Sequence, residues 1–451
     1  MIFRRDLRLA DNTALALALE QSDAVIPSFI CDPRQLEENP YRGDNAVQFL
    51  VESLEDLEEQ LRQRRGRLFY FWGQADEVIE QVLSHVRIGA LFVNRDYTPF
   101  ARRRDEALQR ACEARGVRFF SCADALLHEP EQVLKPDGSP YTMFTPFFKR
   151  SAQHPVHEPS AVPKGKFFLG EIASQTGGSL DRMLTTRSKS LFTPGGRAAG
   201  LKLIKGIASL GDYATDRNRP DIRGTSGLSA HHKFGTVSVR ETYHATAKFF
   251  GESHPLLTEL HWRDFFTHIG FHFPHVFGEA FHTKYAAIRW RADAASFERW
   301  CRGETGFPIV DAGMRQLNSS GWMHNRVRMI VASFLTKDLH IDWRLGERYF
   351  ATRLIDYDPA VNNGNWQWSA SVGCDAAPYF RIFNPWLQQK RFDPQAAYIK
   401  RWVPELKTLA AEEIHSLHRR PNLTPRGYPQ PMVDHSIEAE IAKKMFKDLR
   451  A

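Results

Sequence analysis

The densest group of chemically useful side chains lies at 356–368, where the sequence reads DYDPAVNNGNWQW. Asp356 and Asp358 are followed by a proline, asparagines and a glycine, residue types that do not continue a helix comfortably. The segment therefore predicts a loop that holds carboxylates and amides in a fixed backbone geometry. Trp366 and Trp368 follow on alternate positions. Because a structural turn would not ordinarily be followed by two large aromatic residues, we favour a functional role.

A second group lies at 322–329, WMHNRVRM, on a predicted helix. Asn325 and Met329 are four residues apart and share one helix face, and Trp322 lies three residues before Asn325. An amide, an arginine and a thioether beside an indole suit a planar heteroaromatic ligand. The alternative is ordinary packing, in which the helix buries Trp322 and Met329 while its histidine and arginines meet solvent.

A third group, GTSGLS at 224–229, precedes an apolar stretch and ends in Ser229, which could cap a helix. Small hydroxyl residues at a helix start leave backbone N–H groups free to bind an anion, and a pyrophosphate would suit the site. An ordinary helix cap is the alternative for this segment taken alone.

Several common site signatures are missing. No GxGxxG or GxxxxGK[ST] follows a predicted strand, and there is no GxSxG nucleophile elbow. The histidines, among them His261, His268, His272 and His275, fit neither HExxH nor a zinc finger, and the five cysteines form no CxxC pair. We therefore predict no metal site and no disulfide framework.

The elements that must position these groups fall into two kinds. Residues 1–120 alternate in the α/β manner, with helical spacing at 45–65 and 99–115, which predicts a parallel sheet. Strands are expected at a short segment, 1–3, and at 25–30, 68–72, 90–94 and 117–120.

The rest of the chain has a different character. Residues 123–200 are rich in Pro, Gly, Ser and His and predict a long connector. Beyond 200 the strand signal vanishes and helical periodicity takes over. Helices are expected at 255–273, 296–302, 307–319, 322–340 and 344–355. Nine of the ten tryptophans lie between 262 and 402, a clustering that packing alone does not explain.

Composition sets outer limits on function. A chain of 451 residues exceeds one compact core, so two or three domains are expected. Lys+Arg 60 against Asp+Glu 53 gives a net charge of +7, which modestly favours a polyanionic partner. No run approaches a membrane span, and the charged start MIFRRDLRLADN does not resemble a secretory signal, so we expect a cytoplasmic protein.

Several long motifs, in order along the chain, resemble the photolyase/cryptochrome family, and among its branches the class I cyclobutane pyrimidine dimer photolyases. They are FRRDLRLADN (3–12), YTMFTPFFK (141–149), GTSGLS, ELHWRDFF (259–266), TGFPIVDAGMRQL (305–317), WMHNRVRM, DYDPAVNNGNWQW, RIFNP (381–385) and YIKRWVPEL (398–406). The resemblance implies an α/β antenna domain at 1–125, a connector at 126–200 and an all-α FAD-binding domain at 201–451.

The resemblance also implies a set of FAD ligands. Tyr213 and the run Thr225, Ser226, Gly227, Leu228 and Ser229 would hold the flavin phosphates and ribityl chain. Arg328, Asp356 and Asp358 would hold the isoalloxazine and ribityl groups. Asn362 would lie beside flavin N5, where a neutral amide, unlike an acid, cannot donate a proton; this favours the anionic reduced flavin.

Catalytic and substrate residues follow from the same resemblance. Trp366, Trp343 and Trp290 match an electron relay that runs from the flavin toward solvent. The implied dimer pocket consists of Glu259, Trp262, Asn325, Met329 and Trp368, and implied DNA contacts are Arg217, Arg326 and Gln388. Trp262 and Trp368 would stack on the flipped dimer, and a protonated Glu259 in an apolar site would donate to a thymine carbonyl.

The implied activity is light-driven repair of pyrimidine dimers in DNA by reduced FAD, in a monomer without an obligate protein partner or membrane attachment. An antenna pigment of deazaflavin or folate type is implied, and NRDYTPFARRRD (94–105) does not decide between the two. Two alternatives are a blue-light receptor of the cryptochrome type and a (6-4) photolyase. Asn325 and Met329 stand where the (6-4) branch uses a histidine pair, and Asn362 argues for repair over signalling.

Overall fold

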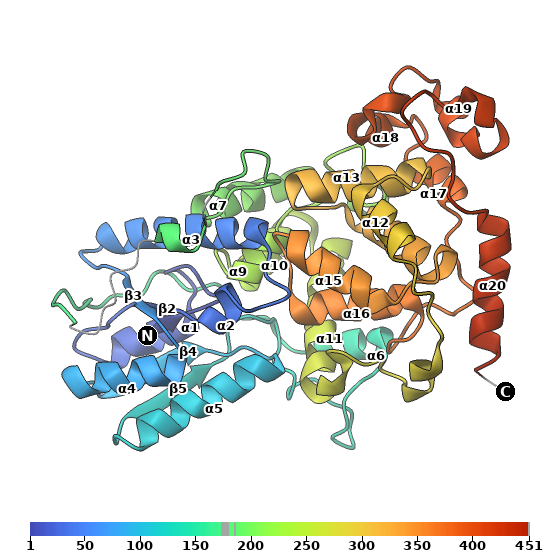
Figure 1. The fold of residues 1–451 in the computed structure, drawn as a ribbon. Coiled ribbons are helices and arrows are strands. Elements are labelled where there is room, and N and C mark those ends of the chain that lie inside the picture. The colour runs from blue at the N-terminus through green and yellow to red at the C-terminus, as the bar shows by residue number, and fades with distance from the viewer. Residues whose placement is uncertain (173–179, 185, 450–451) are drawn as a thin grey trace.

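A computed structural model describes residues 1–172, 180–184 and 186–449. The chain begins with a five-stranded parallel sheet in the order β3-β2-β1-β4-β5 and continues as an array of helices (Figure 1). The strands are β1 (Ile2–Phe3), β2 (Ser28–Cys31), β3 (Phe69–Trp72), β4 (Ala90–Asn94) and β5 (Arg118–Cys122). The predicted parallel sheet, with its very short first strand, is confirmed.

Side chains alternate between the two faces of the sheet, as the period of a strand requires. Phe3 and Phe92 join the core cluster under α1 (Thr13–Gln21) and α3 (Asp44–Arg62). Their neighbours on the strands join a second cluster with α4 (Ala75–His85) and α5 (Pro99–Glu113). Helices therefore cover both faces. The sequence predicted α3 and α5, and it missed α1, α4 and the short α2 (Pro33–Leu36).

The helical part holds the remaining helices of the described chain. They are α6 (Phe144–Ser151), α7 (Arg197–Gly206), α8 (Tyr213–Asp216), α9 (Ser229–Phe234), α10 (Val239–Phe250), α11 (Pro255–His272), α12 (Ala294–Arg302), α13 (Pro308–Ser320), α14 (Asn325–Ser333), α15 (Trp343–Arg353), α16 (Pro359–Ala370), α17 (Pro385–Phe392), α18 (Ala397–Trp402), α19 (Ala411–His415) and α20 (His435–Lys447). A π-helical turn, Phe334–Asp338, follows α14. The expected all-α character is confirmed.

Three helices, α11, α15 and α16, pack closely at the centre of this part (Figure 1). Glycine permits the approach at two points. A Cβ on Gly364 of α16 would lie 2.0 Å from Phe266 Cδ1 on α11. A Cβ on Gly346 of α15 would lie 2.2 Å from Trp366 Cη2 on α16. Larger residues at either point would force these helices apart.

Residues 356–368 correct the sequence prediction, because most of the expected loop is the helix α16. Asp358 is its N-cap, with an extended backbone (φ −114°, ψ 121°), and Oδ1 accepts from the N–H groups of Ala360 and Val361. Proline at the first helical position needs no N–H partner and carries a helical φ, so it starts this helix instead of breaking it. The tryptophans therefore project from a helix.

Two further predictions were wrong in detail. The helix expected over 322–329 begins only at Asn325, because the His324 ring caps it by accepting from the N–H of Arg326 at 3.2 Å. Trp322 consequently lies outside that helix. Ser229 is the first residue of α9, not its cap, and the N-cap, Leu228, makes no side-chain hydrogen bond.

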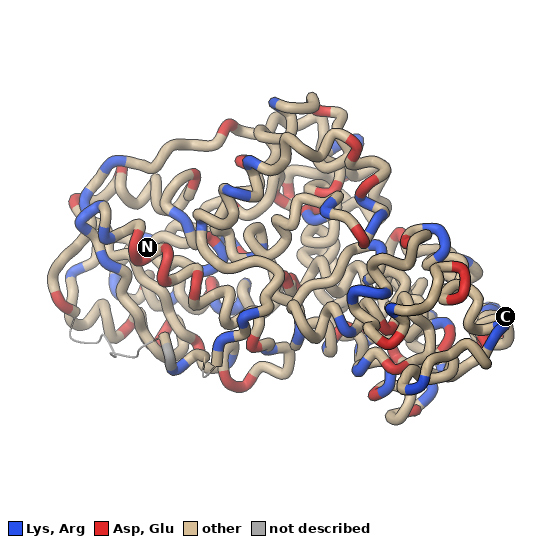
Figure 2. Tube along the Cα trace, turned by 90° about the horizontal axis from the view of Figure 1, so that it is seen from above, with Lys and Arg blue, Asp and Glu red and all other residues tan. Residues whose placement is uncertain are grey.

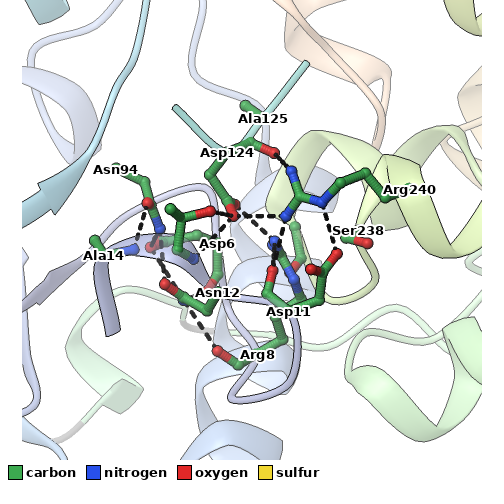
Figure 3. Close-up of polar contacts among 12 residues, drawn as sticks. Asp6, Arg8, Asp11, Asn12, Ala14, Asn94, Asp124, Ala125, Ser238 and Arg240 are labelled. Atoms are coloured by element: carbon green, nitrogen blue, oxygen red, sulfur yellow. Dashed lines mark hydrogen bonds and ion pairs between the residues drawn. The ribbon is translucent and has the colours of Figure 1, made fainter. Parts of the chain in front are cut away.

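A buried polar network joins the sheet to the helical part (Figure 3). Arg240 of α10 pairs with Asp11 at 2.9 Å and with Asp124 at 3.0 Å. Asp124, which follows β5, also pairs with Arg8 at 2.7 Å. Burial alone would raise the pKa of Asp124, but the two guanidinium groups outweigh that effect and lower it. The charges are therefore compensated only while both parts of the chain are docked.

The net positive charge lies in the helical part of the chain: residues 1–200 contain 26 Lys and Arg against 27 Asp and Glu, and residues 201–451 contain 34 against 26. Within each part, charges of both signs lie close together along the described trace (Figure 2). No helix in the described chain is both long and apolar enough to cross a bilayer.

Removing Arg240 tests the network that joins the two parts. Arg240→Met leaves Asp11 and Asp124 buried with fewer compensating charges, so the unfolding free energy should fall by about 3 kcal/mol. Urea denaturation at neutral pH measures the loss. Arg302→Met is the matched control, since the loss of its exposed pairs with Glu298 and Glu304 should leave the unfolding free energy almost unchanged. Equal losses in the two variants would contradict this account.

Candidate functional site

A cavity of about 460 Å³ lies in the helical part, between α8, α9, α11, α14, α15 and α16. Most of the predicted site residues line it. They are Tyr213, Arg217, Thr225, Ser226, Gly227, Leu228, Ser229, Glu259, Trp262, Asn325, Arg326, Arg328, Met329, Asp356, Asp358, Asn362, Trp366 and Trp368. Segments up to about 150 residues apart in the sequence thus meet at one site.

Three predicted site residues are not among those that line the cavity. Trp343 is the first residue of α15 and is buried in the main hydrophobic cluster of the helical part. Trp290 is half-buried against the same cluster, in the segment before α12. Gln388 lies on α17, whose Phe392 supports the Arg326 guanidinium at 4.5 Å from the ring centroid.

Asp356 and Arg328 form a fixed polar pair in the cavity wall. Arg328 Nη2 donates to Asp356 Oδ2 at 2.8 Å, and Arg328 Nε donates to the Met323 carbonyl at 2.8 Å. Asp356 Oδ1 is buried and has no hydrogen-bond partner within the described residues. A buried acceptor without a partner is costly, so a ligand with an N–H or O–H group would stabilise this wall.

Asp358 has a more structural position than the sequence predicted. One oxygen caps α16, and the other accepts from Arg5, which follows β1 of the sheet. Burial alone would raise the pKa of Asp358, but Arg5, Lys233 and Arg263 outweigh that effect and hold it well below its ordinary value. Asp358 therefore stays charged and is already fully hydrogen-bonded.

Asn362 lies one helical turn after Asp358, and a hydrogen bond to α15 fixes the orientation of its amide. Its Nδ2 donates to the main-chain carbonyl of Glu347 on α15 at 3.2 Å. Because the amino end is held in this way, the amide oxygen is the group left for the cavity, which Asn362 lines. Asn363 donates to Glu347 Oε1 at 3.2 Å, and burial raises the pKa of Glu347 to about 7.

Glu259 departs from the expected apolar environment. Its carboxylate pairs with Arg217 Nη1 at 2.7 Å, and both side chains are 29% exposed. A protonated glutamate needs an apolar enclosure, whereas Glu259 lies beside a guanidinium group and is accessible to solvent. The pair also engages Arg217, which we had predicted to contact DNA.

Trp366 connects the cavity to the aromatic core. It is buried, and its ring lies 5.0 Å from Phe350 and 6.2 Å from Trp300, both in edge-to-face geometry. Trp300 is fully buried and donates from Nε1 to the Val331 carbonyl at 3.1 Å. Nothing in the sequence distinguishes Trp300 from a core residue, because one tryptophan on an amphipathic helix is typical of core packing.

Cationic residues near the cavity were also missed. Lys233 and Arg263 line it, and Arg5 reaches it from the sheet through Asp358. Burial, together with the charge of Arg5, lowers the pKa of Lys233 to about 8. Lys233 could have been found from its place four residues after Ser229 on the same short helix. Arg5 could not, since 353 residues separate it from Asp358.

Metal binding was predicted to be absent, and in the described part of the chain no group of three or more His, Cys, Asp or Glu is arranged to hold an ion. The described cysteines are all unpaired. The cavity therefore offers carboxylates, amides, cations and indoles, a donor set for an organic ligand with planar and charged parts.

A parallel α/β unit joined to a helical unit, with a cavity lined by cations, carboxylates, amides and indoles, defines a two-part protein suited to an organic ligand. Residues 1–164 match the family model described as DNA photolyase, and residues 256–448 match the FAD binding domain of DNA photolyase. The chain belongs to the DNA photolyase family.

Individual relatives agree over nearly the full length. A deoxyribodipyrimidine photo-lyase of Alkalihalophilus pseudofirmus is 39% identical, over 99% of this chain and 97% of its own. An archaeal photolyase from Sulfolobus tokodaii, whose crystal structure holds two FAD molecules, has a TM-score of 0.89 at 42% identity and 99% coverage of both chains. A class III photolyase from Agrobacterium tumefaciens has a TM-score of 0.92 at 36% identity, covering 100% of this chain and 97% of its own.

The proton on Glu347 gives a pH-dependent test of the cavity wall. The unfolded chain loses this proton near its ordinary pKa of 4.5, whereas the folded protein keeps it up to about 7. Stability should therefore fall as pH rises through that window, by about 3 kcal/mol relative to Glu347→Gln, which carries no such proton. Denaturation of both proteins from pH 4 to 8 measures the difference. If the stability curves of wild type and Glu347→Gln ran parallel from pH 4 to 8, they would contradict a buried, protonated Glu347. As a control, the curve of the exposed variant Glu298→Gln should run parallel to that of wild type.

Proposed function

We propose that this protein repairs cyclobutane pyrimidine dimers in DNA with light, using a reduced FAD held in the cavity described above. One observation carries the proposal: the residues expected to hold FAD and those expected to hold the dimer line one and the same cavity. Electron transfer falls steeply with distance, so a donor and an acceptor that react must share such a space.

The chain's own residues fit an FAD. The unpartnered Asp356 Oδ1 and the Arg328 guanidinium offer an acceptor and a cation to a heteroaromatic ring. Residues 225–229 line the cavity where α9 begins, with Lys233 further along the same helix as a cation for phosphate groups. When bound and photoexcited, reduced FAD supplies the electron that opens the cyclobutane ring, and the electron afterwards returns.

Asn362 acts on the protonation of the flavin. The Glu347 carbonyl holds its amino group, so its oxygen is free to accept a hydrogen bond from an N–H group such as flavin N5–H. A neutral amide cannot supply the proton that an aspartic acid at this position could. The residue therefore suits a reduced flavin, which carries N5–H, and supplies no further proton to it.

The dimer side of the cavity combines stacking and polar groups. Trp262 and Trp368 offer indole faces, which contribute about 1–3 kcal/mol per stacked base. Glu259 is held by Arg217, so in the absence of DNA its position is set by an ion pair. We propose that Glu259 contacts the thymine carbonyl side of the dimer, and that Asn325 and Met329 complete the pocket.

We also propose that three residues contact the DNA backbone. Arg326 donates from Nη2 to Asn218 Oδ1 at 2.6 Å and lies over Phe392, so its guanidinium is held near the cavity. Arg217 and Gln388 are the other proposed contacts. Because phosphate contacts release counterions, affinity for damaged DNA should fall with added salt.

Trp366, Trp343 and Trp290 are proposed to pass an electron inward to oxidised flavin. Trp366 lines the cavity, and the other two lie in or against the aromatic core behind it. This order leads from the cavity wall to a half-buried indole, as a relay that ends near solvent requires.

A second chromophore in the sheet unit is also proposed, of deazaflavin or folate type. At the carboxyl ends of the strands, Arg4 and Arg104 share Asp105, and each retains a buried Nη2 without a hydrogen-bond partner among the residues described. Two such donors suit an anionic or carbonyl-bearing ligand and do not distinguish the two types. The domain boundaries after residues 125 and 200, a cytoplasmic location and a monomeric state also stay predictions.

The decisive experiment is illumination of the purified protein with an oligonucleotide that carries one cyclobutane dimer. The protein should be coloured by flavin and, once reduced with dithionite, should restore the dimer to two thymines under near-UV light and not in the dark. Parallel oligonucleotides with a (6-4) photoproduct should stay unrepaired. A flavin-loaded protein that repairs neither lesion would contradict the proposal and favour the receptor alternative.

Trp366→Phe separates the relay from the repair reaction. The variant keeps a buried aromatic ring but loses the readily oxidised indole, so light-driven reduction of its flavin should slow at least tenfold. Repair by the dithionite-reduced variant should stay within about twofold of wild type. Trp402→Phe, at the end of α18, is the matched control and should change neither rate. Wild-type photoreduction in Trp366→Phe would refute the relay.

A further inference from the structure

The motif YTMFTPFFK has no role in the site described so far, although it forms α6 beside the cavity wall. Phe144, the first residue of α6, is buried and lies flat against Trp262 of α11. Their ring centroids are 3.5 Å apart and their planes differ by 7°. This is full face-to-face contact, and it covers one face of the indole.

The other aromatic neighbours of Trp262 determine which part of its indole can face the cavity. Phe265 meets the indole edge-on, with an interplanar angle of 82° and centroids 5.7 Å apart. Phe266 stacks against the indole with centroids 5.5 Å apart and an interplanar angle of 30°, and, like Trp262, it lines the cavity. Phe144 and Phe265 are not among the lining residues, so Trp262 and Phe266 present the cavity side of this aromatic cluster.

Phe144 is itself held in place from several sides. Its main-chain N–H donates to Asp375 Oδ2 at 3.0 Å, where Asp375 adopts a positive φ of 46°. Phe148 of the same helix and Phe265 of α11 pack against its ring at 5.8 and 5.7 Å. The ring is therefore held by the hydrogen-bonded start of α6 and by two aromatic rings other than Trp262.

We infer that Phe144 is a positioning residue that fixes the plane of Trp262 for stacking on a flipped pyrimidine dimer. A stacking side chain that is already immobile loses less conformational entropy when a base binds. The inference rests on the proposed function, because it assigns Trp262 to the dimer pocket. It adds α6 to the binding machinery, although Phe144 touches neither cofactor nor substrate.

Phe144→Met removes the flat face and keeps a large apolar side chain, and Phe144→Leu is a second ring-free variant. Both should bind a dimer-containing oligonucleotide in the dark about three- to tenfold more weakly than wild type. Their affinity for the undamaged oligonucleotide should not change. Phe144→Tyr, which keeps the ring, should restore dimer affinity, and retained flavin absorbance confirms that each variant folds.

Phe297→Met is the matched control, because Phe297 of α12 stacks on Trp300, a tryptophan outside the proposed dimer pocket, with ring centroids 5.8 Å apart. It should stay within about twofold of wild type for both oligonucleotides. A double-mutant cycle with Trp262→Leu isolates the route of the effect. If Phe144 acts through Trp262, then Phe144→Met should cost nothing further in the Trp262→Leu background.

The outcomes are distinguishable. A wild-type protein that binds damaged and undamaged DNA equally contradicts the proposed function and removes this inference with it. A wild type that prefers damaged DNA, together with Phe144 variants that keep that preference, overturns the inference alone. An equal loss from Phe144→Met with and without Trp262 also overturns it, since the ring would then act by another route.

Discussion

The carboxylate of Asp358 is the contact on which the cavity depends. It caps α16 with one oxygen and accepts from Arg5 of the sheet unit with the other. Asn362, Trp366 and Trp368 follow on that helix, so their positions are set by where α16 begins and how it is rotated. A single charged group thus joins the α/β unit to one wall of the cavity. Its low pKa keeps the joint intact across the physiological range.

The electrostatics around the cavity favour a bound anion. Burial raises the pKa of Glu347 and of Asp264 to about 7, so these two acids carry reduced negative charge near neutrality. Arg5, Lys233 and Arg263 lie near Asp358 and lower its pKa. Arg217, Arg326 and Arg328 add positive charge to the cavity lining. A reduced flavin and a phosphate chain both benefit from that balance.

Much of this was available from the sequence. Buried strands and several amphipathic helices were predicted because their hydrophobic periodicity is strong, and α3 and α5 were found within a few residues, whereas α4 and α10 were missed. The segment at 356–368 was mistaken for a loop, because Pro, Asn and Gly were weighed as helix breakers. Their position directly after a capping aspartate, where proline begins a helix, decided the outcome.

The site was predicted as a set of residues, but its connections were not. The resemblance to a family placed eighteen residues that do line one cavity. It could not show that Arg217 pairs with Glu259, that Phe144 lies flat on Trp262, or that Arg5 reaches Asp358. Each of these contacts joins residues far apart in the chain, and periodicity carries no information about such pairs.

The network around Asp124 has a consequence for biosynthesis. Arg240 is made 116 residues after Asp124, which at ordinary elongation rates is a delay of about ten seconds. During that interval the nascent α/β unit has its strands and the Arg8–Asp124 pair but lacks the guanidinium that pairs with Asp11. The buried charges of this unit are therefore fully compensated only after α10 has left the ribosome and docked.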